Sequence, residues 1–188
     1  MPVVRLAQLI VEAKSGPFSY ASTQVDIPLI GLPATGFIKD ADLYPGEAEG
    51  GIENEPHVTV LYGLLTEDPD EVEAVVQGFG PVTLRLDKTI VFRNDKATQA
   101  QQGADYEVVV LAIKSPDLER LHTLIAYHLD YENDRPYYVP HLTVAYVQPG
   151  CGAAYEGRVV PGFTGREFRM DTLTFCSKTG DPVSISLI

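Results

Sequence analysis

Two short strings of the sequence place a hydroxyl two residues after an imidazole. Residues 57–60 read His-Val-Thr-Val, and residues 141–144 read His-Leu-Thr-Val. Histidine has an unperturbed pKa of about 6.5, so it can take up or release a proton near neutral pH. A threonine hydroxyl can donate a hydrogen bond to a charged oxygen in a transition state. Two such pairs suit cleavage of a phosphodiester, in which one histidine activates the attacking hydroxyl or water and the other protonates the leaving oxygen.

The two strings belong to a longer internal repeat. Residues 56–62 match residues 140–146 at five positions, which hold Pro, His, Thr, Val and Tyr. The string Arg-x-Asp recurs at 85–87 and 169–171, at the same spacing of 84 positions that separates residue 57 from residue 141. A single His-x-Thr would more often reflect packing, but burying two unpaired histidines for packing alone would be costly. The repeat favours a shared function and indicates two related α+β lobes, with the Arg-x-Asp strings as candidates for structural ion pairs.

With these motifs, the sequence resembles the two-histidine (2H) phosphoesterase superfamily, which includes LigT-type RNA 2′,3′-cyclic phosphodiesterases. The resemblance covers about residues 37–188. It implies an α+β fold of two pseudo-symmetric lobes, whose antiparallel sheets line a central cleft and whose helices lie on the outside. It also implies that His57 and His141 are the catalytic acid–base pair and that Thr59 and Thr143 bind phosphate.

A narrower resemblance is to the phage anti-CBASS branch of this superfamily, on the strings at residues 53–64, 115–118 and 140–146. Proteins of that branch degrade the cyclic oligonucleotide messengers of bacterial immunity, and one histidine activates a ribose 2′-hydroxyl against the adjacent 3′–5′ phosphate. The resemblance implies a metal-independent phosphodiesterase that cleaves small cyclic oligonucleotides. Two alternatives remain open. One is hydrolysis of a terminal 2′,3′-cyclic phosphate, and the other is a sponge that binds cyclic nucleotides without turnover.

Strands must position these side chains. Residues i and i+2 of a strand point to the same face. His57 and Thr59 are therefore expected to share a face with Leu61, while Tyr62 points to the opposite, apolar face. The same alternation is expected for residues 141–147.

The remaining elements follow from local signals, and the whole chain, residues 1–188, is expected to form one bilobal domain. Capping residues followed by proline and acidic residues predict helices over about 66–78 and 115–129. A near-continuous apolar run at 106–113 predicts a central strand. Residues 168–176 are predicted as one strand, and residues 1–25 as an N-terminal arm or an edge strand.

Three further sets of residues bear on the site. Tyr138, in a loop three residues before His141, is the predicted base-stacking residue. His122 and His128, in the second predicted helix, are expected at its edge or surface. No cluster of His, Cys, Asp or Glu has the spacing of a metal site, so neither a metal nor another cofactor is predicted.

Composition restricts the partners. The net charge of −12 would repel a long nucleic acid and favours a small nucleotide as substrate. No apolar run approaches the ~20 residues of a membrane span. The two cysteines are too few for a disulfide framework, so we expect a cytoplasmic protein, in the host cytoplasm if it is phage-encoded. The oligomeric state stays open.

Overall fold

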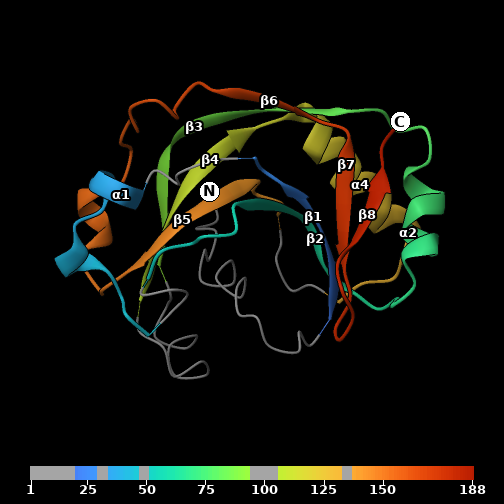
Figure 1. The fold of residues 1–188 in the computed structure, drawn as a ribbon, viewed down its shortest axis with the longest axis horizontal. Coiled ribbons are helices and arrows are strands. Elements are labelled where there is room, and N and C mark those ends of the chain that lie inside the picture. Colours follow the sequence, from blue (N-terminus) through green and yellow to red (C-terminus); the bar gives the residue numbers. More distant parts are fainter. Residues whose placement is uncertain (1–19, 29–33, 47–50, 94–105, 133–136) are drawn as a thin grey trace.

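A computed structural model of the chain describes residues 20–28, 34–46, 51–93, 106–132 and 137–188. In these residues the chain forms two antiparallel four-stranded sheets, which together make a curled half-barrel with its longer helices on the outside (Figure 1). The predicted α+β class, with antiparallel sheets and external helices, is confirmed.

The first sheet contains the strand of the first motif. Its strands, in spatial order, are β2 (His57–Leu64), β1 (Ala21–Asp26), β7 (Thr172–Cys176) and β8 (Val183–Ser186). Because β1 lies between β2 and β7, residues 21–25 belong to an interior strand. The predicted arm or edge strand is therefore wrong for these residues, and residues 1–19 lie outside the described part of the chain.

The second sheet contains the strand of the second motif. Its strands, in spatial order, are β5 (His141–Val147), β4 (Glu107–Lys114), β3 (Val82–Arg93) and β6 (Glu167–Met170). β4 is interior, as its apolar sequence predicts. The prediction of one strand over 168–176 is wrong, because the chain leaves the second sheet after β6 and enters the first as β7.

The helices α2 (Pro69–Val76) and α4 (Pro116–His128) both cover the outer face of the first sheet (Figure 1). Each begins at a predicted cap, since the side chains of Asp68 and Ser115 accept backbone N–H bonds at 3.0 Å. Their buried apolar residues pack on the apolar face of the sheet, and each fully buried side chain contributes about 1.5–3 kcal/mol. These residues are Val72, Val76, Leu118, Leu121 and Ile125.

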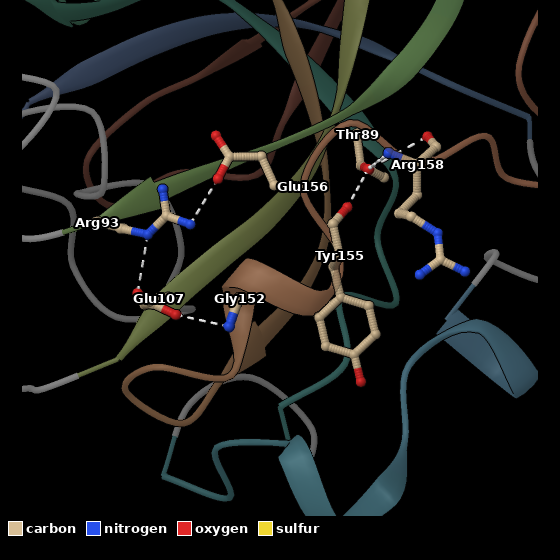
Figure 2. A network of polar contacts seen from close by, with 7 residues as sticks. All are labelled: Thr89, Arg93, Glu107, Gly152, Tyr155, Glu156 and Arg158. Carbon is tan, nitrogen blue, oxygen red and sulfur yellow. Dashed lines mark hydrogen bonds and ion pairs between the residues drawn. The ribbon is translucent and has the colours of Figure 1, made fainter.

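The outer face of the second sheet is covered by shorter elements. They are α1 (Ala34–Phe37), η2 (Asp40–Asp42), η3 (Gly152–Ala154) and the loop that follows η3. Figure 2 shows how this loop is attached to β3 and β4. The Glu107 carboxylate accepts bonds from Arg93 Nε at 3.1 Å and from the Gly152 N–H at 2.7 Å.

A second part of the same network is centred on Thr89. Its hydroxyl donates to the Tyr155 carbonyl and accepts a bond from the Arg158 N–H at 2.9 Å (Figure 2). Since Thr89 is fully buried, these bonds satisfy a hydroxyl that would otherwise be costly to desolvate. The loop is therefore held to β3 by polar contacts as well as by packing.

The pairing of β3 with β6 displays the internal repeat directly. Leu84 pairs with Phe168, Thr83 pairs with Arg169, and Arg85 pairs with Glu167. Leu84 and Phe168 are themselves 84 positions apart, so the repeat maps this pair onto itself. It also exchanges the Thr83–Arg169 pair with the Arg85–Glu167 pair. A pseudo-twofold axis therefore passes through the Leu84–Phe168 pair. The ion pair that the structure shows for the first Arg-x-Asp string joins Asp87 to Lys114 on β4, at 2.6 Å.

Candidate active site

β2 presents its histidine and threonine on the inner side of the half-barrel. Val58 and Val60 are buried in the core beneath the helices, whereas His57 and Thr59 are partly exposed on the opposite face. The alternation predicted for the start of this strand is therefore confirmed.

A β-bulge interrupts the alternation immediately after the motif. On β1, Gln24 pairs with Thr59 and the next residue, Thr23, pairs with Leu61, so Val60 has no opposite residue. The side chains of Val60 and Leu61 consequently point the same way, and both are buried. The expected faces of Leu61 and Tyr62 are therefore wrong. Leu61 points into the core, and Tyr62 shares the inner face with His57 and Thr59.

β5 repeats this geometry at the equivalent position. Val109 pairs with Ala145 and Val110 pairs with Thr143, which leaves Val144 as the bulged residue. Val144 lies 84 positions after Val60, so the repeat extends to a backbone irregularity. In β5, too, the tyrosine that follows the motif points to the same face as the histidine and threonine.

The second motif has apolar and aromatic surroundings on the inner face. His141 and Thr143 are 6% and 8% exposed, so they are buried more deeply than their counterparts in β2. The imidazole of His141 contacts the ring of Phe92 edge-on, with centroids 4.8 Å apart. Tyr146 is 1% exposed and packs with Phe92 and Tyr106.

Both histidines make the same backbone contact. Nδ1 of His57 lies 2.8 Å from the Glu55 carbonyl, and Nδ1 of His141 lies 2.7 Å from the Val139 carbonyl. A carbonyl only accepts, so this contact places a proton on Nδ1 of each ring. In the neutral ring, Nε2 is then the nitrogen that takes up a proton. The chain thus sets the same tautomer at both positions.

The two motif strands lie next to each other although they belong to different sheets. Tyr138, in the segment that leads into β5, donates its hydroxyl to the Thr59 carbonyl at 2.9 Å. The structure therefore brings the two His-x-Thr pairs onto neighbouring strands, and a hydrogen bond joins the first motif strand to the segment that leads into the second.

The Tyr138 ring stacks on the imidazole of His122, with centroids 4.2 Å apart and planes within 2°. Nδ1 of His122 lies 2.7 Å from the Val60 carbonyl, so the stacked pair binds both carbonyls that flank the bulge in β2. Burial lowers the pKa of His122 below its ordinary value, while the bond to the Val60 carbonyl opposes the shift. This link between α4 and the motif strand was not predicted. The only sequence signal was the position of His122 one turn after the buried Leu118.

The predicted role of Tyr138 in base stacking remains a prediction. One face of its ring packs on His122. His128 is exposed on α4, as predicted.

The two motifs differ in the residue that faces each histidine across the sheet. Asp26 of β1 pairs with His57, whereas Ala112 of β4 pairs with His141. The Asp26 carboxylate accepts bonds from Gln24 Nε2 at 2.6 Å and from the Thr174 hydroxyl at 2.5 Å. A charged group is therefore fixed beside the first motif, and a methyl group stands at the same place beside the second.

In the described parts of the chain, no group of three or more His, Cys, Asp or Glu side chains is arranged to hold a metal ion. None of the helices described is long and apolar enough to cross a membrane. Cys151 and Cys176 are both free thiols.

Comparisons with known proteins match both the sequence and the fold. A family model described as "2′-5′ RNA ligase superfamily" matches residues 51–182, a span that includes both motifs. Usb1 of Kluyveromyces marxianus, solved with uridine monophosphate, is similar with a TM-score of 0.56 and 10% identity over 89% of this chain and 98% of that one. TT0787 of Thermus thermophilus is similar with a TM-score of 0.52 and 16% identity over 90% and 95% of the two chains. At these identities the similarity establishes the fold. No curated protein matches the sequence.

Proposed function

Because the chain belongs to the 2′-5′ RNA ligase superfamily of 2H phosphoesterases, we propose that it is a metal-independent phosphodiesterase that cleaves small cyclic oligonucleotides. The observation that carries the proposal is the duplicated histidine geometry. Two imidazoles, each held by a backbone carbonyl at Nδ1, occupy equivalent positions on neighbouring strands. Each has a threonine two residues further along the same face.

The proposed reaction needs one neutral and one protonated imidazole. Nε2 of the neutral histidine removes the proton of a ribose 2′-hydroxyl, and the 2′-oxygen forms a bond to the adjacent phosphorus. The bond from phosphorus to the 5′-oxygen breaks, and the protonated histidine gives its Nε2 proton to that oxygen. His57 and His141 fill these roles, and the hydroxyls of Thr59 and Thr143 donate to the non-bridging oxygens, where charge develops.

The products identify the attacking group. Attack by the 2′-hydroxyl yields a linear oligonucleotide with a 2′,3′-cyclic phosphate at one end and a 5′-hydroxyl at the other. The LigT-like alternative is attack by water on a 2′,3′-cyclic phosphate, which yields a terminal phosphomonoester. K. marxianus Usb1, which has a similar fold, was solved with uridine monophosphate, and this supports a nucleotide substrate under either reaction.

A panel of cyclic dinucleotides and trinucleotides, incubated with the protein in EDTA, tests the proposal. Mass spectrometry is expected to find linear products that end in a 2′,3′-cyclic phosphate. Intact ligand that is released again on denaturation would support the sponge instead, and cleavage that stops in EDTA would contradict the metal-independent mechanism. Cleavage restricted to linear substrates that already end in a 2′,3′-cyclic phosphate would favour the LigT-like alternative.

We further propose a cytoplasmic location, in the host cytoplasm if the protein is phage-encoded. Two free thiols in the described residues support a reducing compartment. A net charge of −12 supports a small nucleotide rather than a long nucleic acid as partner.

A further inference from the structure

Glu53 is a buried acidic residue that the proposed reaction does not use. It lies in the segment that leads into β2 and is 7% exposed. A carboxylate at such a position is costly unless it is hydrogen-bonded. Oε1 of Glu53 accepts a bond from the Glu55 N–H at 3.0 Å. The buried side chain therefore binds the backbone of the residue whose carbonyl holds His57.

The turn between Glu53 and His57 is fixed at three points. Glu53 binds the Glu55 N–H, and the Glu55 carbonyl lies 2.8 Å from Nδ1 of His57. Pro56 has a fixed φ and restricts Glu55 to extended conformations. The Pro56 carbonyl accepts a bond from the Ile27 N–H at 2.8 Å. The direction of the Glu55 carbonyl is thereby set, and that carbonyl decides which nitrogen of His57 carries the proton.

The backbone of Glu53 is bound to the strand of the second motif. Its N–H donates to the carbonyl of Val144, the bulged residue of β5, at 3.2 Å. The preceding residue, Ile52, forms an antiparallel bridge with Ala145. Glu53 thus contacts one motif strand through its amide and the turn before the other through its carboxylate. A residue in this position can fix His57 relative to the second motif.

The second motif has no equivalent carboxylate. The residue 84 positions after Glu53 is Tyr137, which is 60% exposed. His141 makes the same Nδ1 contact, but burial and the edge-on contact with Phe92 also hold its ring. His57 is more exposed than His141. The orientation that packing gives to His141 therefore needs another source at His57, and Glu53 supplies a bonded one.

We propose that Glu53 is a positioning residue, which sets the orientation and the tautomer of His57 through the Glu55 peptide. With the Glu55 carbonyl in place, Nδ1 of the neutral ring keeps its proton and Nε2 is the nitrogen that exchanges one. The consequence for the reaction rate rests on the proposed function. The consequence for the tautomer does not, because it concerns the free protein.

NMR of the imidazole nitrogens tests the tautomer. At about pH 8, above the ordinary histidine pKa of about 6.5, the ¹⁵N shifts of neutral rings distinguish the protonated nitrogen from the unprotonated one. Glu53→Met has a similar length and lacks the acceptor oxygen, so its His57 signals are expected to move toward the Nε2–H tautomer. Glu53→Gln keeps an acceptor and should resemble wild type. His141, which is held without a carboxylate, should be unchanged in both variants.

Cleavage of a cyclic dinucleotide by the same variants tests the consequence for the rate. Glu53→Met is expected to lower kcat by up to about 10²-fold with KM unchanged, because it misplaces a proton-transfer group without removing a binding contact. Glu53→Gln should retain most of kcat. Glu71→Met, on the exposed surface of α2, removes the same charge elsewhere and should behave like wild type.

The outcomes separate positioning from folding and from the proposed function. An unchanged His57 tautomer in Glu53→Met, or an equal change at His57 and His141, would overturn the proposal. A changed tautomer in Glu53→Gln would also overturn it, which keeps the test decisive if Glu53→Met unfolds in a thermal melt. A tautomer change confined to His57 in a protein whose wild type cleaves no cyclic oligonucleotide would support the positioning role and refute the proposed function.

Discussion

At the scale of single residues, His57 and His141 are alike in backbone contact and unlike in surroundings. Each ring is held at Nδ1 by the carbonyl of the residue two positions earlier. His57 stands opposite the Asp26 carboxylate, whereas His141 stands opposite Ala112 and against the ring of Phe92. Because both rings have the same tautomer, either can exchange a proton at Nε2. They differ in their neighbours, which are polar for His57 and apolar for His141.

Replacing either histidine by alanine tests the proposed acid–base pair. His57→Ala and His141→Ala are each expected to lower kcat by about 10²–10⁴-fold on the true substrate, because each removes one proton-transfer group. The measurement is single-turnover cleavage of a cyclic dinucleotide. His128→Ala, on the exposed surface of α4, is the control and should retain the wild-type rate. Wild-type rates in both active-site variants would show that the acid and base lie elsewhere.

At the scale of elements, the bulge in β2 is the feature that decides which side chains reach the inner face. Its two flanking carbonyls, of Thr59 and Val60, accept bonds from Tyr138 and His122. A helix and a loop from other parts of the chain therefore hold the backbone of the motif strand in place.

Removing the histidine donor should weaken this element. His122→Leu deprives the buried Val60 carbonyl of its bond from Nδ1 and is expected to cost about 1–3 kcal/mol in the free energy of unfolding. His122→Asn retains a donor near the position of Nδ1 and should lose less. Urea denaturation of the two variants measures the difference, and equal stability of both would contradict a role for this bond.

The same residue gives the stability a pH dependence. Burial lowers the pKa of folded His122 below its ordinary 6.5, so between the two values the unfolded chain binds a proton that the folded chain excludes. Stability therefore falls as the pH drops from about 6.5 through this window, and His122 contributes nothing to the slope above it. Urea midpoints at about pH 7.5 and about pH 5.5 should show a smaller loss in His122→Asn than in wild type. An equal loss would show that other groups cause the dependence.

The end of β2 depends on a glycine. Gly63 has a φ of +93°, and a Cβ there would overlap the carbonyl group of Glu132. Gly63→Ala is expected to destabilise the fold by about 2–4 kcal/mol through backbone strain and overpacking. Gly78→Ala, which also has a positive φ but meets no atom within 4 Å, should cost only the strain. Thermal unfolding of the two variants checks this, and equal losses would mean that the contact with Glu132 relaxes.

Local signals predicted some of these elements and missed others for a physical reason. The caps at Asp68 and Ser115 act within their own helix turns, so the starts of α2 and α4 could be predicted from nearby residues. The bulge at Val60 depends on the register with β1, which nothing near residue 60 specifies. A strict period of two therefore placed Tyr62 on the wrong face. The interior position of β1 was missed for the same reason, because it depends on pairing with β7 from the far end of the chain.

At the scale of the whole molecule, the pseudo-twofold axis relates the two motifs but not what surrounds them. Both long helices cover the first sheet, and short elements cover the second (Figure 1). The inner face of the first sheet carries Ser22, Gln24 and Asp26, whereas that of the second carries Phe92 and Tyr146. The two His-x-Thr motifs are equivalent, but the inner faces of the two sheets carry different side chains. This arrangement suits a substrate whose phosphate contacts both motifs in the same way and whose two nucleosides contact different residues.

The net charge of −12 is expected to slow the association of an anionic substrate with the protein. An anionic nucleotide is repelled over a distance that shrinks from about 30 Å at 0.01 M salt to about 8 Å at 0.15 M. We therefore expect kcat/KM for a cyclic dinucleotide to rise by a few-fold over this range, opposite to the trend of proteins that bind nucleic acid through basic surfaces. A single-stranded RNA of about 20 nucleotides should inhibit poorly, and its inhibition should strengthen with salt, because a longer polyanion is repelled more. Repeating the series with sodium acetate in place of sodium chloride controls for specific ions. A steep loss of kcat/KM with salt would instead reveal a basic surface that overrides the net charge.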